Sequence, residues 1–309
     1  MSNIKAIQAC LQQLNHIILG KDHETKLALT CILAKGHLLI EDLPGMGKTT
    51  LSHALANCLS LSYQRIQFTS DLLPGDVLGL NIFDRNKGTF HFQPGPIFSN
   101  VILADEINRA TPKTQSALLE AMEEGQVTHE GETRPLPQPF FVIATQNPSD
   151  QAGTHPLPES QLDRFMMRIS LGYPSAEYEK QLLKGSDRRK LISQLQTCLQ
   201  SDTLEKIQQL VGKVKCADSL IDYLYQLVAF SRQNISSEHL NASHGLSPRA
   251  AISLLHCAKA WALIDGRNHL LPDDIQAVFP SVAEHRISNG HCLANNPLSQ
   301  NILKSVDIF

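Results

Sequence analysis

The spacing of apolar residues predicts helices and buried strands in the first half of the chain. Residues 3–15 carry apolar side chains every three or four positions, which is typical of an amphipathic helix, and residues 22–35 indicate a second helix. Short apolar runs follow at 37–40, 101–104 and 140–144. Strands of a parallel sheet covered on both faces have this pattern, so we expect the three runs to lie in one such sheet.

Helical patterns lie between the apolar runs, at 48–59 and at 112–124. This alternation predicts an α/β core of three layers, with helices on both faces of the sheet. Two stretches rich in Gly and Pro interrupt it, at 71–98 and 125–139, and they favour hairpin-like inserts; for the first, we expect no helix. In sheets of this kind, ligands bind at the carboxyl ends of the strands.

The pattern changes after Tyr173. From about residue 174 onward it predicts helices and no convincing buried strand, with a long helix over 250–264. We therefore expect two domains: an α/β core over residues 1–173, which contains both inserts, and an all-α domain over residues 174–309.

Composition narrows the class of protein. The 309 residues are 42% hydrophobic and 18% charged, which is ordinary for a soluble globular protein. The formal net charge of −3 argues against a dedicated nucleic-acid-binding protein, which usually carries a basic surplus. One basic cluster is visible, at 187–190, and we interpret it as the solvated start of a helix.

Cysteine and histidine spacing favours neither a disulfide framework nor a zinc site. The seven cysteines include no C-x-x-C pair, and the thirteen histidines show no H-E-x-x-H spacing. The first twenty residues lack the features of a signal peptide, and no stretch approaches the roughly 20 apolar residues of a membrane span. We expect a cytoplasmic protein without a membrane span.

A glycine-rich loop after the first apolar run predicts a site for ATP. The loop and the start of the next helix read Pro44-Gly45-Met46-Gly47-Lys48-Thr49-Thr50. In such a loop the backbone N–H groups cradle the phosphates, the lysine reaches the β- and γ-phosphates, and the Thr49 hydroxyl binds Mg²⁺. The full motif, G-x-x-x-x-G-K-[ST], has glycine where this chain has Asp42, so the match is incomplete.

Polar residues also follow the other two apolar runs. At the end of the second run, Asp105 would hold Mg²⁺ and Glu106 would polarise the attacking water, although Asp105 could instead be a helix N-cap. At the end of the third run, Asn147 could bind the γ-phosphate or orient the water, but an Asn-Pro pair is often simply a turn.

Two arginines could add positive charge at the nucleotide. Arg164 lies in Gln161-Leu162-Asp163-Arg164-Phe165. Arg249 follows Ser247-Pro248, the expected start of a helix in the second domain, from which it could reach across to the nucleotide. Taken alone, each arginine is more typical of a surface ion pair.

Several segments together strongly resemble the MoxR family of AAA+ ATPases. The resemblance is carried by 104–110, 112–124, 145–148, 157–165 and 247–249, which occur in the family's order. It extends from about residue 16 to 270. Aspartate at position 42 is also familiar for this family.

The resemblance implies an AAA+ core of the helix-2-insert type followed by a helical lid. It implies that Asn147 is sensor 1, that Arg249 is sensor 2 on the lid, and that Arg164 is the arginine finger offered to the neighbouring subunit's γ-phosphate. Arg109 is the rival for that trans role. Family members typically form hexameric rings that remodel client proteins, many with a partner that contains a von Willebrand factor A domain.

Three functions remain open at this point. The first is a Mg²⁺-dependent ATPase that moves lid against core to remodel a protein client, with the inserts at 71–98 and 125–139 as the contacting elements. The second is a ring motor with a different client, either in metal chelation or on nucleic acid. The third is a scaffold that binds ATP with little turnover.

Overall fold

The computed structural model describes residues 3–129, 131–147, 153–184, 191–192, 195–233, 244–288 and 297–308. The basic cluster at 187–190 and Pro148 lie outside the described residues. Among the helices that are described, none combines the length and the apolarity that crossing a membrane requires.

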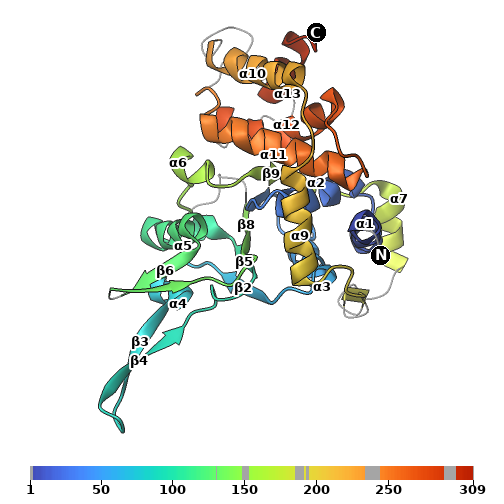
Figure 1. Ribbon diagram of the computed structural model, residues 1–309. Helices are drawn as coiled ribbons and strands as arrows, with labels where there is room; N and C mark the ends of the chain where they lie inside the picture. The colour runs from blue at the N-terminus through green and yellow to red at the C-terminus, as the bar shows by residue number, and fades with distance from the viewer. Residues whose placement is uncertain are drawn as a thin grey trace.

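A five-stranded parallel sheet forms the centre of the first domain (Figure 1). Its strand order is β2-β5-β8-β1-β9. The strands are β1 (Leu38–Glu41), β2 (Tyr63–Gln67), β5 (Val101–Asp105), β8 (Phe141–Gln146) and β9 (Met167–Ile169). The three predicted strands are β1, β5 and β8, which occupy the middle of the sheet.

Alternate residues of the central strands enter two separate hydrophobic clusters, as the pleat requires. On β1, Leu38 and Ile40 join one cluster and Leu39 joins the other. The first cluster includes α1 (Asn3–Ile17), α2 (Asp22–Leu33) and α3 (Lys48–Cys58). The second includes α5 (Pro112–Glu124). The sheet is therefore covered on both faces, and the predicted three-layer core is confirmed.

Both predicted inserts contain hairpins. The first is β3 (Gly79–Asp84) with β4 (Thr89–Pro94), and the second is β6 (Gln126–His129) with β7 (Glu132–Pro135). The expectation that the first insert has no helix was wrong, because α4 (Pro74–Leu78) precedes β3. Pro74 begins this short helix, where its missing N–H costs no hydrogen bond.

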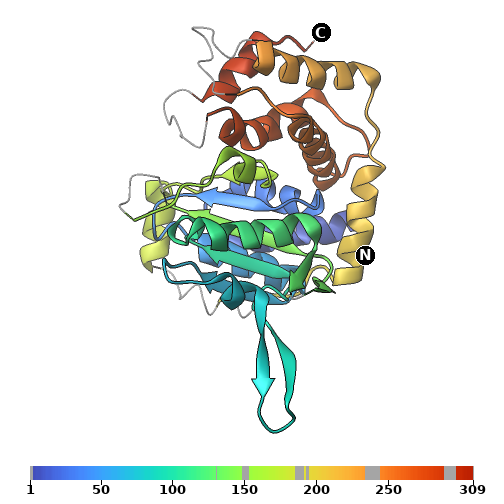
Figure 2. The same cartoon turned by 90° about the vertical axis from the view of Figure 1, so that its left-hand side faces the viewer.

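The described residues after β9 form helices and no named strand. They are α7 (Ala176–Lys184), α9 (Ser201–Gly212), α10 (Asp218–Gln233), α11 (Pro248–Ile264), α12 (Pro272–Ile287) and α13 (Leu298–Ser305). In Figure 2 the last four of these helices lie at one end of the molecule, and the β3–β4 hairpin projects from the other. An α/β core is thus followed by a helical lid, as predicted.

The segment between core and lid returns to the core. The backbone N–H groups of Cys198 and Leu199 both donate to the carbonyl oxygen of Cys58 at the end of α3, at 2.9 and 3.1 Å. Further on, α11 packs against α2 and so joins the lid to the core. The domain boundary near residue 173 stays a prediction.

Candidate functional site

The loop after β1 has the open, left-handed backbone that a phosphate cradle needs. Gly45 and Gly47 have φ of +84° and +92°, which disfavour other residues, and no atom lies within 4 Å of a Cβ built at either position. Gly47 is also the N-cap of α3, so the positive end of the helix dipole opens onto this loop. The backbone can therefore approach a phosphate chain closely.

Lys48 is held at the mouth of this loop although only 7% of it is exposed. Its Nζ donates to the carbonyl oxygen of Asp42 at 2.7 Å and to Oδ1 of Asn147 at 3.1 Å. Burial lowers the pKa of Lys48, and the nearby carboxylates, Asp105 foremost, oppose that shift. The ammonium group thus already points toward the edge of the sheet where a phosphate would meet it.

Asp42, the departure from the glycine motif, has a structural role. Its Oδ2 accepts the backbone N–H groups of Leu171 and Gly172 at 2.5 and 2.8 Å, just after β9. Its Oδ1 accepts from the N–H of Leu43 at 3.2 Å. A glycine could not make these bonds, so the aspartate fixes the base of the loop to the outer strand.

Asp105 lies at the end of β5 between a hydroxyl and a guanidinium. Thr145 Oγ1 donates to its Oδ1 at 2.6 Å, and Arg65 Nη2 contacts its Oδ2 at 2.6 Å. The alternative reading of Asp105 as a helix N-cap was wrong, because the N-cap of the next turn is Glu106 and that of α5 is Thr111. The carboxylate is free of a capping role.

Glu106 has the left-handed backbone conformation, with φ of 57°, which non-glycine residues rarely adopt. Its Oε1 accepts from Asn147 Nδ2 at 3.0 Å. Its Oε2 accepts from Gln67 Nε2 at 3.1 Å and pairs with Arg109 Nε at 2.9 Å. Since Asn147 also accepts from Lys48, one hydrogen-bonded chain joins the ends of β1, β8 and β5.

The residues at this edge fit a hydrated Mg²⁺. Magnesium prefers hard oxygen ligands, and Asp105 offers a carboxylate and Thr49 a hydroxyl at the start of α3. Asp105 Oδ2 already forms an ion pair with the Arg65 guanidinium, so the surroundings of this oxygen tolerate a positive charge. Pro44, Met46 and Thr50 belong to the loop and the first turn of α3 that surround the same place.

Arg164 and Arg249 lie together, away from Lys48. Arg164 Nη2 is 3.2 Å from Oε2 of Glu123, and Arg249 Nη2 is 2.5 Å from Oε1 of the same carboxylate. The hydrogen bond from Arg249, more than the charge of Arg164, lowers the pKa of Glu123. The structure therefore brings the two predicted arginines to each other and not to the glycine loop.

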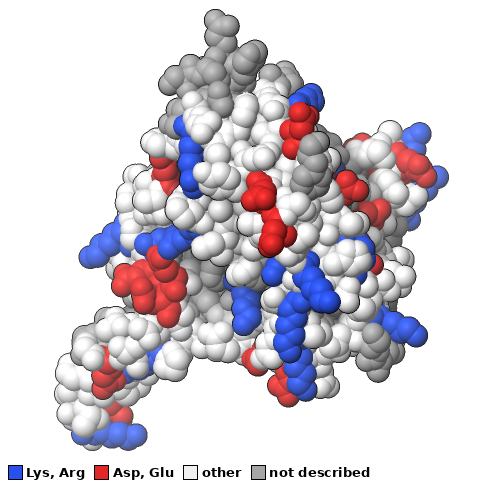
Figure 3. Space-filling view, turned by 45° about the horizontal axis from the view of Figure 1, so that its top comes forward, with Lys and Arg blue, Asp and Glu red and all other residues white. Residues whose placement is uncertain are grey.

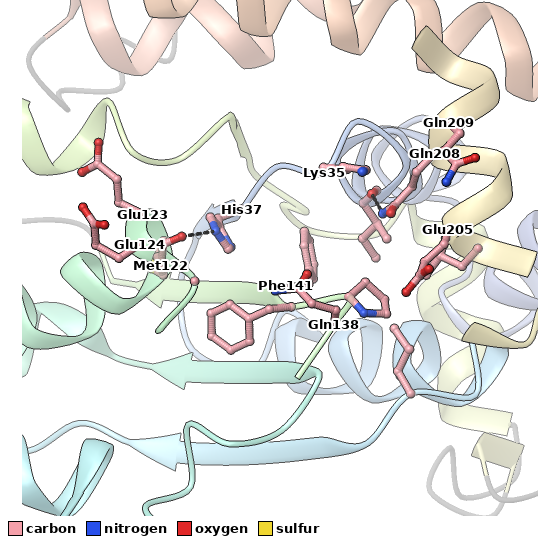
Figure 4. Close-up of a pocket in the computed structure, with 16 residues that line it drawn as sticks. Lys35, His37, Met122, Glu123, Glu124, Gln138, Phe141, Glu205, Gln208 and Gln209 are labelled. Carbon is pink, nitrogen blue, oxygen red and sulfur yellow. Dashed lines mark hydrogen bonds between the residues drawn. The ribbon is translucent and has the colours of Figure 1, made fainter. Parts of the chain in front are cut away.

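This second group lies at the amino edge of the sheet. Glu123 is in the last turn of α5, which begins near the carboxyl edge and runs for roughly 20 Å across the sheet. The next residue back, Met122, accepts a hydrogen bond of 3.2 Å from Nε2 of His37, the residue before β1. Figure 4 shows this contact in a cavity of about 450 Å³, with Glu123 and Glu124 on one side and Gln208 of α9 on the other.

A half-buried carboxylate next to Arg164, Asp163, joins the core to the lid. Asp163 Oδ1 accepts from Arg286 Nε of α12 at 2.7 Å, and the Arg286 side chain is only 5% exposed. Asp163 also accepts from the hydroxyl of Ser247, the N-cap of α11, at 3.4 and 3.5 Å. Because Arg249 is two residues after Ser247, these contacts set the backbones of Arg164 and Arg249 relative to each other.

Sequence reasoning missed three side chains of these two groups: Arg65, Gln67 and Glu123. Arg65 and Gln67 lie on β2, whose residues are mostly exposed and gave no strand signal. Glu123 belongs to a segment that carries the family resemblance, yet no local pattern identified its partners, which are 41 and 126 residues away.

Charged side chains are interspersed on the face shown in Figure 3. Lys and Arg lie beside Asp and Glu there, and no broad field of a single sign covers this face among the described residues. The view gives no support for an extended basic track.

Comparison with known proteins assigns both domains. Residues 37–167 match the ATPase family associated with various cellular activities (AAA), and residues 235–305 match the AAA lid domain. A solved structure of a candidate ATPase from Cytophaga hutchinsonii superposes with a TM-score of 0.87 and 38% identity, and the match covers 99% of this chain and 95% of that one.

Two curated relatives span most of the chain. The uncharacterized protein YeaC of Bacillus subtilis is 44% identical over 277 residues, 90% of this chain and 85% of the relative. Chaperone MoxR1 of Mycobacterium tuberculosis is 36% identical over 290 residues, 93% of this chain and 76% of the relative.

Proposed function

Because the chain belongs to the MoxR family of AAA+ ATPases, we propose that it hydrolyses ATP with Mg²⁺ and uses the cycle to remodel a protein client. One observation carries the proposal. Lys48, Asn147 and Glu106 are linked by hydrogen bonds of 3.1 and 3.0 Å at the carboxyl ends of three central strands, beside an open phosphate loop.

Each residue of this edge has a role in phosphoryl transfer. The N–H groups of the loop and Lys48 bind the β- and γ-phosphates. Glu106 accepts a proton from the attacking water, and Asn147, which contacts both Lys48 and Glu106, keeps water and γ-phosphate in line. Thr49 and Asp105 would hold Mg²⁺, which neutralises charge on the phosphate oxygens when it is bound.

Arg164 is our choice for the charge supplied in trans. It lies at the amino edge, away from the Lys48 of its own chain, and its side chain is 30% exposed, so a neighbour could reach its guanidinium. Arg109, the rival, pairs with its own Glu106, which favours a role within its own subunit. Arg249 lies beside Arg164, which favours an action on the same neighbour over an action on its own nucleotide.

The β3–β4 hairpin is the element we assign to client contact. Phe83 and Phe90 are 50% and 69% exposed near its tip, with ring centroids 5.1 Å apart. Exposed apolar groups on a projecting hairpin suit unfolded or apolar segments of a client. Changing both to Ser should remove ATP-dependent protection of a chemically unfolded test protein and leave ATP hydrolysis intact; unchanged protection would exclude the hairpin.

A closed ring of identical subunits would bring the amino edge of each subunit to the carboxyl edge of its neighbour. Because members of the family typically form hexameric rings, we expect a hexamer. A partner with a von Willebrand factor A domain belongs to the same proposal. Purified protein mixed with such a domain should show faster or slower ATP hydrolysis, and an unchanged rate at saturating domain would exclude that partner.

The first test is ATP hydrolysis per subunit, with Mg²⁺, as protein concentration rises. A site completed between subunits gives a rate per subunit that increases and then saturates, and Arg164→Ala should remove most of the increase while ATP binding persists. Absence of hydrolysis at every concentration would contradict the proposal and favour a nucleotide-binding scaffold.

A further inference from the structure

One carboxylate lies between the two arginines of the amino edge. Its two oxygens are used separately: Oε2 of Glu123 pairs with Arg164 at 3.2 Å, and Oε1 pairs with Arg249 at 2.5 Å. Arg164 comes from the end of the core, just before β9, and Arg249 from the first turn of α11 in the lid. A single side chain thus connects two guanidiniums that belong to different domains.

Stability alone does not account for this arrangement. The side chains of Glu123, Arg164 and Arg249 are 35%, 30% and 49% exposed, and ion pairs in such positions contribute little to folding. The relative placement of the two domains here is already held by another ion pair, that of Asp163 with Arg286, whose guanidinium is only 5% exposed. The exposed triad is therefore available for another purpose.

The chemistry of the triad suits a phosphate group. Two arginines and one carboxylate leave one net positive charge, and their N–H groups are already side by side. Guanidinium groups bind phosphate through paired hydrogen bonds, and two together can contact several oxygens of one group. Without the carboxylate, the two like charges would repel each other and separate.

We propose that Glu123 is a positioning residue that holds Arg164 and Arg249 together for a phosphate group of ATP bound to a second copy of this chain. The proposal rests on the trans role assigned above to Arg164. Because both ion pairs are exposed and weak, an arriving phosphate can draw the guanidiniums away from Glu123 at low cost. Glu123 therefore orients the two guanidiniums before the phosphate arrives, and does not prevent them from moving onto it.

The variant Glu123→Gln tests this with little change of shape. It should lower kcat of the assembled protein about tenfold, since misplaced charge at a phosphoryl group is costly, and leave KM and the affinity of the variant's own site for ATP within about twofold. Glu124→Gln is the matched control: it removes the same charge one residue along the helix, and Glu124 makes no ion pair within the described part of the chain. A similar fall in both variants would overturn the proposal.

Mixed assemblies separate a positioning role from a defect of the variant's own site. Subunits with Glu106→Gln cannot activate water but keep normal arginines. Adding them in excess to Glu123→Gln subunits should raise hydrolysis per Glu123→Gln subunit, because normal arginines then reach its intact site. Wild-type subunits mixed in the same way measure any inhibition by Glu106→Gln itself.

Arg164→Ala subunits mixed with Glu106→Gln subunits show which proposal fails. If both Arg164→Ala and Glu123→Gln recover, the trans role and the positioning role are both supported. If only Arg164→Ala recovers, Glu123 does not act through the arginines, and the trans ATPase stands. If neither recovers, the trans role of Arg164 fails, and the role of Glu123 fails with it.

Discussion

The two edges of the central sheet hold charged groups in opposite ways. At the carboxyl edge, Lys48 and Asp105 are almost fully buried, and each already contacts a side chain at the end of β8, Asn147 and Thr145 respectively. At the amino edge, Arg164 and Arg249 are partly exposed and share one exposed carboxylate. Groups that need fixed geometry are thus enclosed by their own chain, whereas groups assigned to another molecule stay at the surface.

The largest expected effect on ATP hydrolysis comes from removing the arginine that acts on the nucleotide of a neighbouring subunit, and it shows which edge of the sheet holds that arginine. Arg164→Ala should lower ATP hydrolysis by roughly 10³-fold or more, the usual effect of removing a trans arginine, while Arg109→Ala should lower it by about tenfold or less. Both rates are measured at a protein concentration where the wild-type rate per subunit has saturated. The reverse ranking would make Arg109 the trans residue and end the division between the two edges.

The carboxyl edge should hold the general base. Glu106→Gln removes the group that accepts the proton from water, so hydrolysis should fall by roughly 10²–10⁴-fold. ATP binding, followed by a fluorescent analogue, should persist because Lys48 and the loop are unchanged. Hydrolysis within tenfold of wild type would assign the base to another residue.

His37 should make the amino edge sensitive to acid. Burial lowers its pKa from 6.5 to about 4, and its neutral ring accepts from the N–H of Val142 at 3.0 Å while Nε2 donates to Met122. The unfolded chain takes up this proton near pH 6.5 and the folded chain only near 4. The contribution of His37 is therefore complete above pH 6.5 and is lost as pH falls toward 4, at most about 3 kcal/mol.

Urea unfolding between pH 7.5 and 4.5 measures that loss against His37→Gln, which can make the same two hydrogen bonds without titrating. The free energy of unfolding should fall more steeply for the wild type. Parallel curves for the two proteins would mean that His37 is protonated in the folded state as readily as in the unfolded one.

The smallest effects should separate an ion pair with a buried carboxylate, Arg65 with Asp105, from one with an exposed carboxylate, Arg249 with Glu123. Arg65→Ala removes a hydrogen-bonded partner from Asp105, whose side chain is only 10% exposed, and should cost about 1–2 kcal/mol of stability without nucleotide. Arg249→Ala breaks an exposed pair and should cost about 0–1 kcal/mol. Chemical denaturation of both variants gives the comparison, and equal losses would show that burial does not distinguish the two edges.

The sequence predicted the inner part of the sheet and missed its margins. The runs that became β1, β5 and β8 are apolar because both of their faces are covered, and that continuity is visible locally. On the outer strand β2, one residue of five is buried, so Tyr63–Gln67 looks like a polar segment. The other outer strand, β9, has three residues, and one of them is Arg168, which pairs with Glu41.

The same limit applies to the candidate site. Asp105 and Glu106 could be assigned because they directly follow an apolar run, and Asn147 because it lies three residues after another. Lys48 and Thr49 could be assigned because they follow the glycine-rich loop, and parallel strands end at one edge. Arg65 and Gln67 could not, because their strand was not recognised. The catalytic role of Glu106 stays a prediction, which the variant Glu106→Gln tests.

By itself, the sequence determined the class of core, the phosphate loop and the family, since these depend on patterns a few residues long. Only the tertiary structure decided that Arg249 meets Arg164 through Glu123, and that Asp42 fastens the loop to the end of β9. Those contacts join residues 41 to 129 positions apart. The local spacing of apolar residues cannot predict contacts between residues so far apart in sequence. It indicates which side of a helix or strand is buried, and not which residues pack against that side.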